Sequence, residues 1–206
     1  MANSIFEGMP EMKVKLTLTE EALGMMPSDP RIHDEYIASR APDAESIEEE
    51  IASMGTEAVI EKGKTIFPKL EDGTPFVWDY QIRGMLKDSI GMLRRVSGSK
   101  CAALKNYKKV VDGLIFVKER KIPFKMSGPL GDCQRPLRAE TPQGQRVAIA
   151  HSETVPAGSS LEFTIQLLDD GVRPVIKECM DYGVYRGLAQ WRNSGKGKFT
   201  WEEIKE

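Results

Sequence analysis

The sequence has few cysteines and few histidines. Cys101, Cys133 and Cys179 are odd in number and widely spaced, and no CxxC pair occurs. Only His33 and His151 could supplement them as metal ligands, so the sequence predicts neither a disulfide framework nor a zinc site. We therefore expect a reducing, cytoplasmic location and a chain without a bound metal or other cofactor.

The sequence also lacks long apolar runs and an excess of positive charge. No stretch is apolar and long enough to span a bilayer, and residues 1–10 lack the basic and apolar regions of an export signal. We expect no membrane partner. The formal net charge is -2 and the sequence pI is near 5.9. Proteins that bind duplex nucleic acid through bulk charge are usually basic, so any site for a polyanion must be local.

The chain has enough apolar residues for one core. Its 206 residues are 40% hydrophobic, which favours a single domain over residues 1–206. Two stretches, at about residues 24–63 and 126–155, are predicted to be insertions on that domain.

Residues 12–19 alternate between apolar and polar side chains, as in a half-buried strand. The apolar face would carry Met12, Val14, Leu16 and Leu18. On the other face, Lys13 and Lys15 are equally consistent with a solvated surface and with contact to a phosphate backbone.

The first insertion is rich in proline and acid. Residues 44–54 are predicted to form an amphipathic helix with an acidic face, which favours a solvated or partner-facing surface. His33 lies close in sequence to Asp29, Asp34 and Glu35. An imidazole beside carboxylates could act in proton transfer or metal binding, but solvated loop charges are the favoured interpretation.

Two helices are predicted in the remainder. Asp79 is placed to cap a helix that begins at Tyr80 after a turn at residues 71–73, with Arg83 and Lys87 on its surface. The second helix begins near Pro174. Its predicted buried stripe is Val172, Val175, Ile176, Cys179, Met180 and Gly183.

Four further extended segments are predicted, at residues 114–117, 135–151, 159–168 and 199–202. Residues 135–151 would form a hairpin that is either a projecting basic finger or an ordinary surface ribbon. Its cations are Arg135, Arg138 and Arg146. Residues 97–107 are predicted to be a basic connection around Tyr107, either solvated or in contact with nucleic acid.

Without the insertions, the order is strand, helix, strand, strand, helix, strand. This order is typical of an α+β, ferredoxin-like (RRM-like) fold, in which an antiparallel four-stranded sheet carries both helices on one face. A helical insertion in the N-terminal half and a β-hairpin insertion would be added to it.

Residues 185–199, between the second helix and the last strand, combine glycine, positive charge and an indole. Glycine allows the backbone to approach a phosphate chain closely, while cations and an aromatic ring supply charge and a stacking face. The candidate nucleic-acid-binding residues of this stretch are Arg186, Trp191, Arg192, Asn193, Gly195, Lys196, Gly197 and Lys198. For Trp191, a place in the core is an alternative to stacking on a base.

Three segments resemble the RAMP superfamily, the repeat-associated proteins of CRISPR systems. Residues 78–87 resemble the pattern G-S-x-x-[RK]-G-x-[LI]-[RK] through Arg83, Gly84 and Lys87, with Asp79 and Tyr80 in place of Gly-Ser. Residues 155–165 resemble V-P-x-G-[ST]-x-[FL]-x-[FL]-x-[IL], and residues 185–199 are similar to the glycine-rich loop of the family. The three segments occur in the family's order over most of the chain.

The resemblance implies a subunit that binds single-stranded, guide-like RNA in a ribonucleoprotein of antiviral defence. It also implies self-association along the strand or assembly with other subunits. Arg83 and Lys87 would flank the RNA path, and the C-terminal stretch would hold its phosphates.

The chain departs from the family where its nucleases carry catalytic groups. Residues 22–27 lack the aspartate of subunits that cut RNA, and neither His33 nor His151 lies in a matching motif. We therefore predict no catalytic residues, although an RNA endonuclease using Asp29, His33, Asp34 or His151 remains an alternative. The acidic segment, residues 42–55, is unusual for the family. It suggests a diverged, virus-encoded relative, or an interaction module that inserts into such a complex.

Overall fold

The computed structural model describes residues 8–28, 63–141 and 144–204. Within these residues, three α-helices and two β-sheets form a mixed α+β structure. The predicted helix at residues 44–54 and the group Asp29, His33 and Asp34 lie outside the described residues. No helix in the described part of the chain is long and apolar enough to cross a membrane.

The main sheet is antiparallel, and β1 (Glu11–Leu18) lies second from one edge. β1 pairs with β10 (Ser160–Leu167) on one side and β11 (Phe199–Glu203) on the other. β7 (Lys121–Lys125) pairs with β10, and β5 (Phe76–Trp78) pairs with β7 at the edge. The short β6 (Ile115–Val117), which lies within the strand predicted at residues 114–117, also pairs with β10.

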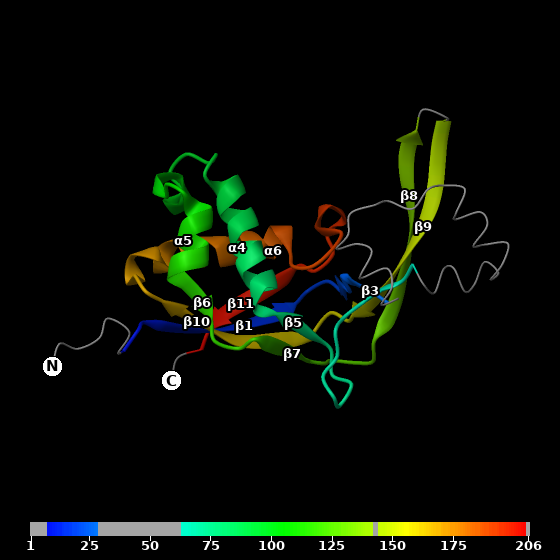
Figure 1. Ribbon diagram of the computed structural model, residues 1–206, viewed down its shortest axis with the longest axis horizontal. Helices are drawn as coiled ribbons and strands as arrows, with labels where there is room; N and C mark the ends of the chain where they lie inside the picture. The colour runs from blue at the N-terminus through cyan, green and yellow to red at the C-terminus, as the bar shows by residue number, and fades with distance from the viewer. Residues whose placement is uncertain (1–7, 29–62, 142–143, 205–206) are drawn as a thin grey trace.

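Figure 1 shows the helices α4 (Asp79–Leu93), α5 (Tyr107–Leu114) and α6 (Arg173–Arg186) on one side of the main sheet. This arrangement and the strand order are compatible with the predicted ferredoxin-like fold. Helix α5 was not predicted, since residues 97–107 were expected to be a connection and residues 114–117 a strand. Its valines and Gly113 have low helix propensity, so it depends on packing, which buries Val111 completely.

The core follows the predicted periodicity. All four apolar side chains of β1 are at most 3% exposed, and the predicted stripe of α6 is buried. Helix α6 approaches β11 closely at Gly183, where a Cβ atom would lie 2.2 Å from the ring of Phe199. On the opposite face of the sheet, Lys15 pairs with Glu202 of β11 at 3.0 Å, so this lysine is partly neutralised.

The start of α4 differs from the prediction. Asp79 does not cap the helix: the Gln81 side chain accepts the Trp78 backbone N–H at 2.8 Å instead. The Asp79 carboxylate pairs with Arg83, at 3.1 Å, and with Arg120. A carboxylate flanked by two guanidiniums gains more from ion pairing than from one neutral cap contact.

The second sheet carries the predicted hairpin. β8 (Gly131–Thr141) and β9 (Gly144–Val155) pair along their full length, and the hairpin projects away from the main sheet (Figure 1). The short strands β2 (Ala22–Leu23) and β4 (Thr65–Ile66) pair with the base of β9. β3 (Met26–Pro27) pairs with β4.

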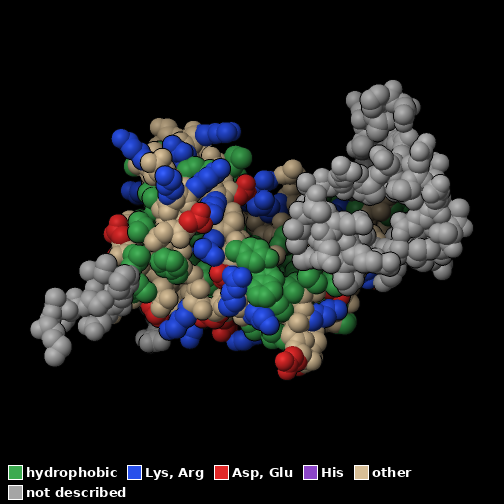
Figure 2. Space-filling view, in the orientation of Figure 1, with side chains coloured by type: hydrophobic (Ala, Val, Ile, Leu, Met, Phe, Trp, Pro, Cys, Tyr) green, Lys and Arg blue, Asp and Glu red, His purple; other side chains and the backbone are tan. Residues whose placement is uncertain are grey.

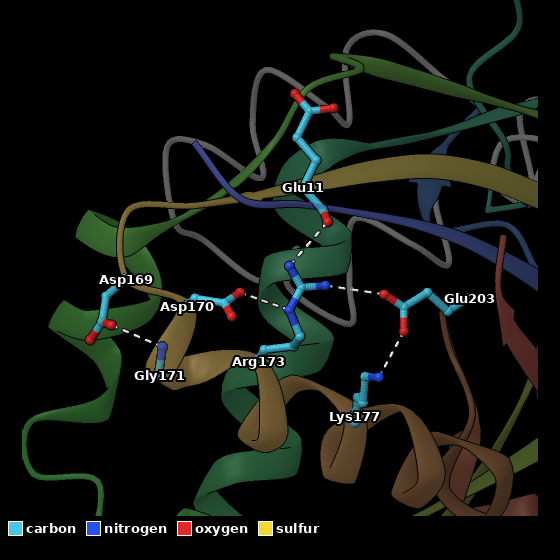
Figure 3. Close-up of polar contacts among 7 residues, drawn as sticks. All are labelled: Glu11, Asp169, Asp170, Gly171, Arg173, Lys177 and Glu203. Atoms are coloured by element: carbon cyan, nitrogen blue, oxygen red, sulfur yellow. Dashed lines mark hydrogen bonds and ion pairs between the residues drawn. The ribbon is translucent and has the colours of Figure 1, made fainter. Parts of the chain in front are cut away.

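The start of α6 is fixed by a group of ion pairs (Figure 3). Arg173 contacts Asp170 through Nε at 2.7 Å and Glu203 of β11 through Nη1 at 3.1 Å, and its Nη2 donates to the Glu11 carbonyl at 3.1 Å. Lys177 Nζ pairs with the other oxygen of Glu203 at 2.7 Å. These contacts tie the first turn of α6 to both β1 and β11.

Candidate functional site

The last turn of α6 leads into the C-terminal loop, residues 187–198, which returns the chain to β11. Gly187 has a φ of +79°, and its N–H donates to the Gly183 carbonyl at 2.7 Å, which ends the helix. The short 3-10 helix η3 (Arg192–Ser194) lies within the loop. Local backbone geometry therefore defines where the helix ends and where the loop turns.

Gly197 joins the two sides of the C-terminal loop. Its N–H donates to the Glu21 carbonyl at 2.8 Å, and its own carbonyl accepts from the N–H of Leu188 at 2.8 Å. A Cβ atom at Gly197 would lie 1.9 Å from the Leu188 oxygen, so no other residue fits here. The N–H of Gly195 donates to the Arg192 carbonyl at 3.0 Å. Both glycine amides are therefore engaged within the protein and are not available to a ligand.

Two arginines of this region share one carboxylate. Arg186 Nε lies 3.1 Å and Arg192 Nη1 lies 2.8 Å from the same oxygen of Asp88, which belongs to α4. Arg186 Nη1 also donates to Asn193 Oδ1 at 2.5 Å. One carboxylate thus pairs with two guanidiniums, so the group of Arg186, Arg192 and Asp88 keeps a net positive charge.

The two lysines of the loop differ in their partners. Lys196 pairs with Glu21 at 2.5 Å, and this hydrogen bond raises the pKa of the lysine. Among the residues that the structure describes, no carboxylate pairs with Lys198. In the described part of the chain, three of the four cations of the region, Arg186, Arg192 and Lys196, therefore form ion pairs with two carboxylates, Asp88 and Glu21, and Lys198 pairs with neither.

Trp191 connects the C-terminal loop to the base of the hairpin. The Arg135 guanidinium lies 4.9 Å from the centroid of the Trp191 ring and donates to Gln190 Oε1 at 3.2 Å. Gln190 in turn donates to the Gly24 carbonyl at 2.8 Å. Arg135 is only 7% exposed, so it is not part of an exposed basic finger, as one interpretation of the sequence suggested. Trp191 is half-buried, with Arg135 against its ring.

Arg83 and Lys87 lie on α4, the helix that supplies Asp88. Their ion pairs are with Asp79, at 3.1 Å, and with Asp112 of α5, at 2.5 Å. In the described part of the chain, no hydrogen bond or ion pair joins either side chain to the C-terminal loop. The structure thus brings the C-terminal candidates together and leaves these two apart from them.

His151 is the one described histidine of the nuclease alternative. It is 9% exposed, and its Nε2 lies 3.2 Å from Asp132 Oδ1. No group of three or more His, Cys, Asp or Glu side chains suited to a metal ion occurs among the described residues.

The residues that position the loop were not found from the sequence. Asp88 and Glu21 contact the loop from separate places in the chain, and Gln190, within the loop, donates to the Gly24 carbonyl. Asp88 and Glu21 lie 104 and 175 residues from their partners Arg192 and Lys196. Residues so far apart in the chain form no local sequence pattern from which these ion pairs could be predicted.

No family model and no curated protein matches the chain. Its fold is similar to a chain in the cryo-EM structure of the type III-B Cmr-beta complex bound to cognate target RNA, with a TM-score of 0.53 and 12% identity. That match covers 95% of this chain, which spans 60% of the other chain. A chain of a type IV-B CRISPR complex is similar with a TM-score of 0.50 and 14% identity, covering 95% of this chain and 90% of that one. At these identities the likeness concerns the fold.

Proposed function

We propose that the chain is a single-stranded RNA-binding subunit of a CRISPR-type ribonucleoprotein, a diverged RAMP protein that holds RNA without cutting it. The observation that carries the proposal is the surplus of positive charge at the C-terminal loop in a chain whose net charge is -2. The fold supports it, because the two similar structures named above are chains of CRISPR complexes and one of these complexes is bound to RNA.

The RNA backbone would be held by side chains rather than by backbone amides. Arg186 and Arg192 already form a paired guanidinium surface around one oxygen of Asp88, and a phosphate can accept from such a surface with two or more oxygens. Ion pairs that reach solvent contribute only about 0–1 kcal/mol, so a phosphate can compete with the carboxylate. Lys198 would bind a further phosphate without displacing a partner.

Trp191 and Asn193 would complete the contact. The open part of the Trp191 ring would stack on or wedge against a base, while Arg135 holds the ring in place from the hairpin side. Asn193, whose carbonyl oxygen accepts from Arg186, retains its NH₂ group as a donor to the RNA.

The chain would assemble with further copies of itself or with other subunits along the RNA. A guide-like RNA longer than one site would be covered by several copies of the chain or by other subunits, with Arg83 and Lys87 flanking its path along α4. The acidic residues 42–55 would serve contacts with those partners. A cytoplasmic location and a virus-encoded origin are part of the same proposal.

The direct test is an anisotropy titration of labelled single-stranded RNA with the variant Arg192→Ala/Lys196→Ala/Lys198→Ala. We expect affinity to fall at least about tenfold, because three of the four cations around the loop are lost. The matched control is Arg173→Ala/Lys177→Ala, which removes two cations from the other end of α6 and should leave affinity unchanged. Unchanged affinity in the loop variant would rule out the proposal.

Trp191 needs a separate test. Trp191→Phe keeps a ring and Trp191→Ala removes it. If the ring stacks on a base, only the alanine variant should lose RNA affinity, and both variants should melt near the wild-type temperature. A large fall in melting temperature with unchanged affinity would assign the ring to the core.

A further inference from the structure

Three aromatic rings and two cations form a second cluster at the junction of β5, α4 and β7. Phe76 and Trp78 meet edge to face, with ring centroids 4.9 Å apart, and Trp78 and Tyr80 are nearly parallel at 6.2 Å. The Arg120 guanidinium lies 5.1 Å from the Trp78 centroid and 5.7 Å from that of Tyr80. Lys121 Nζ lies 5.4 Å from Phe76 and 5.8 Å from Trp78. We call these five residues the aromatic platform.

Asp79 fixes the orientation of the platform. Each of its two carboxylate oxygens pairs with a different arginine, Oδ1 with Arg120 and Oδ2 with Arg83. Asp79 is only 8% exposed, so the anchor is buried while the guanidinium that it holds reaches the surface. This one carboxylate faces two cations, Arg83 and Arg120, and a third cation, Lys121, lies over the adjacent rings. The cluster is therefore locally positive.

The outer part of the platform is open. The Tyr80 residue is 49% exposed and the Arg120 side chain is 65% exposed, whereas Phe76 beneath them is buried at 2%. Figure 2 shows hydrophobic side chains gathered in the middle of this face with Lys and Arg beside them. Core packing explains the position of Phe76. It does not account for an exposed tyrosine and an exposed arginine that lie 5.7 Å apart, guanidinium to ring centroid, at the surface.

We infer that the aromatic platform binds one unpaired nucleotide of a single-stranded RNA. The base would stack on the exposed surface of Tyr80 and Arg120, and the phosphate would accept from Arg120 and Lys121. Aromatic rings and guanidinium planes are the surfaces on which splayed bases stack, and stacking tolerates any base. Among the described residues, Arg120 pairs with Asp79 through Nη1 alone, so its other donors are available to a phosphate.

This inference rests on the proposed function and adds to it a contact that the C-terminal loop does not make. The platform lies at the first turn of α4, whereas the loop meets α4 at Asp88, more than two helical turns further along. Two separate contacts on one helix would fix the direction of the strand as well as its attachment.

The first experiment compares variants of Tyr80 in anisotropy titrations with labelled oligo(U) and oligo(A). Tyr80→Ala and Tyr80→Leu should each weaken binding about tenfold, while Tyr80→Phe should bind as the wild type does, since it keeps the ring. Lys121→Ala should weaken binding and lower the salt dependence. Lys118→Ala is the matched cation control, because Lys118 is 57% exposed but pairs with Glu11 away from the platform, and it should change nothing.

The second experiment locates the base directly. RNA containing 4-thiouridine is cross-linked to the wild-type protein by light, and the modified peptides are identified by mass spectrometry. A cross-link at Trp78 or Tyr80 supports the inference. Cross-links confined to the hairpin and the C-terminal loop would overturn it.

The two proposals fail in different ways. If the Tyr80 variants bind RNA normally while the triple variant of the C-terminal loop does not, the platform is not an RNA contact and the proposed function stands. If Tyr80→Ala changes only the oligomeric state, the platform is covered by another subunit and the inference is wrong. If the wild-type protein binds no single-stranded RNA, both proposals fail.

Discussion

The two ends of helix α6 differ in how their charges are balanced. At the first turn, Arg173 and Lys177 are matched by Asp170 and Glu203, and Arg173 also reaches a carbonyl of β1 (Figure 3). At the last turn and in the C-terminal loop, three cations share Asp88 and Glu21, and Lys198 pairs with no described carboxylate. Balanced charges that join three elements stabilise the fold, whereas a surplus on one surface leaves charge available for an anion.

The comparison therefore separates two roles for the same kinds of residue. Arginine at the start of α6 should matter for stability and not for RNA, and arginine after its end should show the reverse.

Gly197→Ala should have the largest effect, because it breaks the loop that holds the surplus cations. Gly197 has a φ of +69°, and its Cβ would lie 1.9 Å from the Leu188 oxygen. We expect a loss of about 3 kcal/mol or more in the free energy of unfolding, from strain and from forced backbone movement. Urea denaturation measures this loss, and RNA affinity should fall as well.

Gly195→Ala is the matched control for that substitution. Gly195 also has a positive φ, +83°, but the nearest atoms to its Cβ are those of the flexible Lys198 side chain at 3.6 Å. Only the conformational cost of about 1 kcal/mol should appear. Equal losses for the two variants would show that the close contact at Leu188 is not what requires glycine.

Arg173→Ala should destabilise the protein by about 1–3 kcal/mol, because it removes contacts to Asp170, Glu203 and the Glu11 carbonyl together. RNA affinity should not change. Arg192→Ala should give the opposite pattern, with weaker RNA binding and a smaller change in stability. If both variants change only stability, or both change only RNA affinity, the two ends of α6 do not have separate roles.

Asp88→Asn should strengthen RNA binding about threefold, since it removes the carboxylate that competes with phosphate for Arg186 and Arg192. The amide oxygen can still accept a hydrogen bond, so the loop should remain folded. Parallel measurements of affinity and melting temperature check this. Weaker binding at an unchanged melting temperature would mean that Asp88 positions the arginines for the ligand.

The smallest effects should appear in the dependence of stability on pH. The hydrogen bond from Lys177, reinforced by Arg173, lowers the pKa of Glu203. Its stabilisation is therefore complete above the pKa of an unfolded glutamate and is lost as the pH falls through the lower folded value. At the other end of α6, the raised pKa of Lys196 gives a contribution that is complete below the pKa of an unfolded lysine and is lost as the pH rises through the folded value.

The melting temperature as a function of pH measures both contributions. Glu203→Gln should reduce the acid-side loss and leave the alkaline side as it is. Glu21→Gln should reduce the loss of stability on the alkaline side and leave the acid side as it is. The assignment of these ion pairs would be contradicted if Glu203→Gln changed the melting temperature at alkaline pH, or if Glu21→Gln changed it at acid pH.

The periodic parts of the sequence predicted the framework well. The alternation in β1 and β10 and the stripe of α6 each place a single apolar face, and the predicted ends lie close to the observed ones. Helix α5 was missed because its residues have no strong local preference and become helical through packing on α4. The cap assigned to Asp79 was wrong because a tertiary partner, Arg120, lies 41 residues away.

The candidate site was predicted in part. Its cations and glycines were visible as one stretch of sequence, and the structure gathers the C-terminal members around η3. The carboxylates that neutralise them and the contact between Trp191 and Arg135 arise only from the fold. The aromatic platform was hidden for the same reason, since Trp78 and Tyr80 precede Arg120 by about 40 residues.

The most direct test of the central claim is the salt dependence of RNA binding in three proteins. These are the wild type, the loop variant Arg192→Ala/Lys196→Ala/Lys198→Ala, and the helix-start variant Arg173→Ala/Lys177→Ala. For single strands, the slope of log K against log salt concentration changes by roughly 0.7 for each phosphate neutralised. We predict that the slope of the loop variant is shallower by about 2, and that the helix-start variant has the wild-type slope. Equal slopes in the loop variant and the wild type would contradict the claim that the surplus cations after α6 hold the RNA.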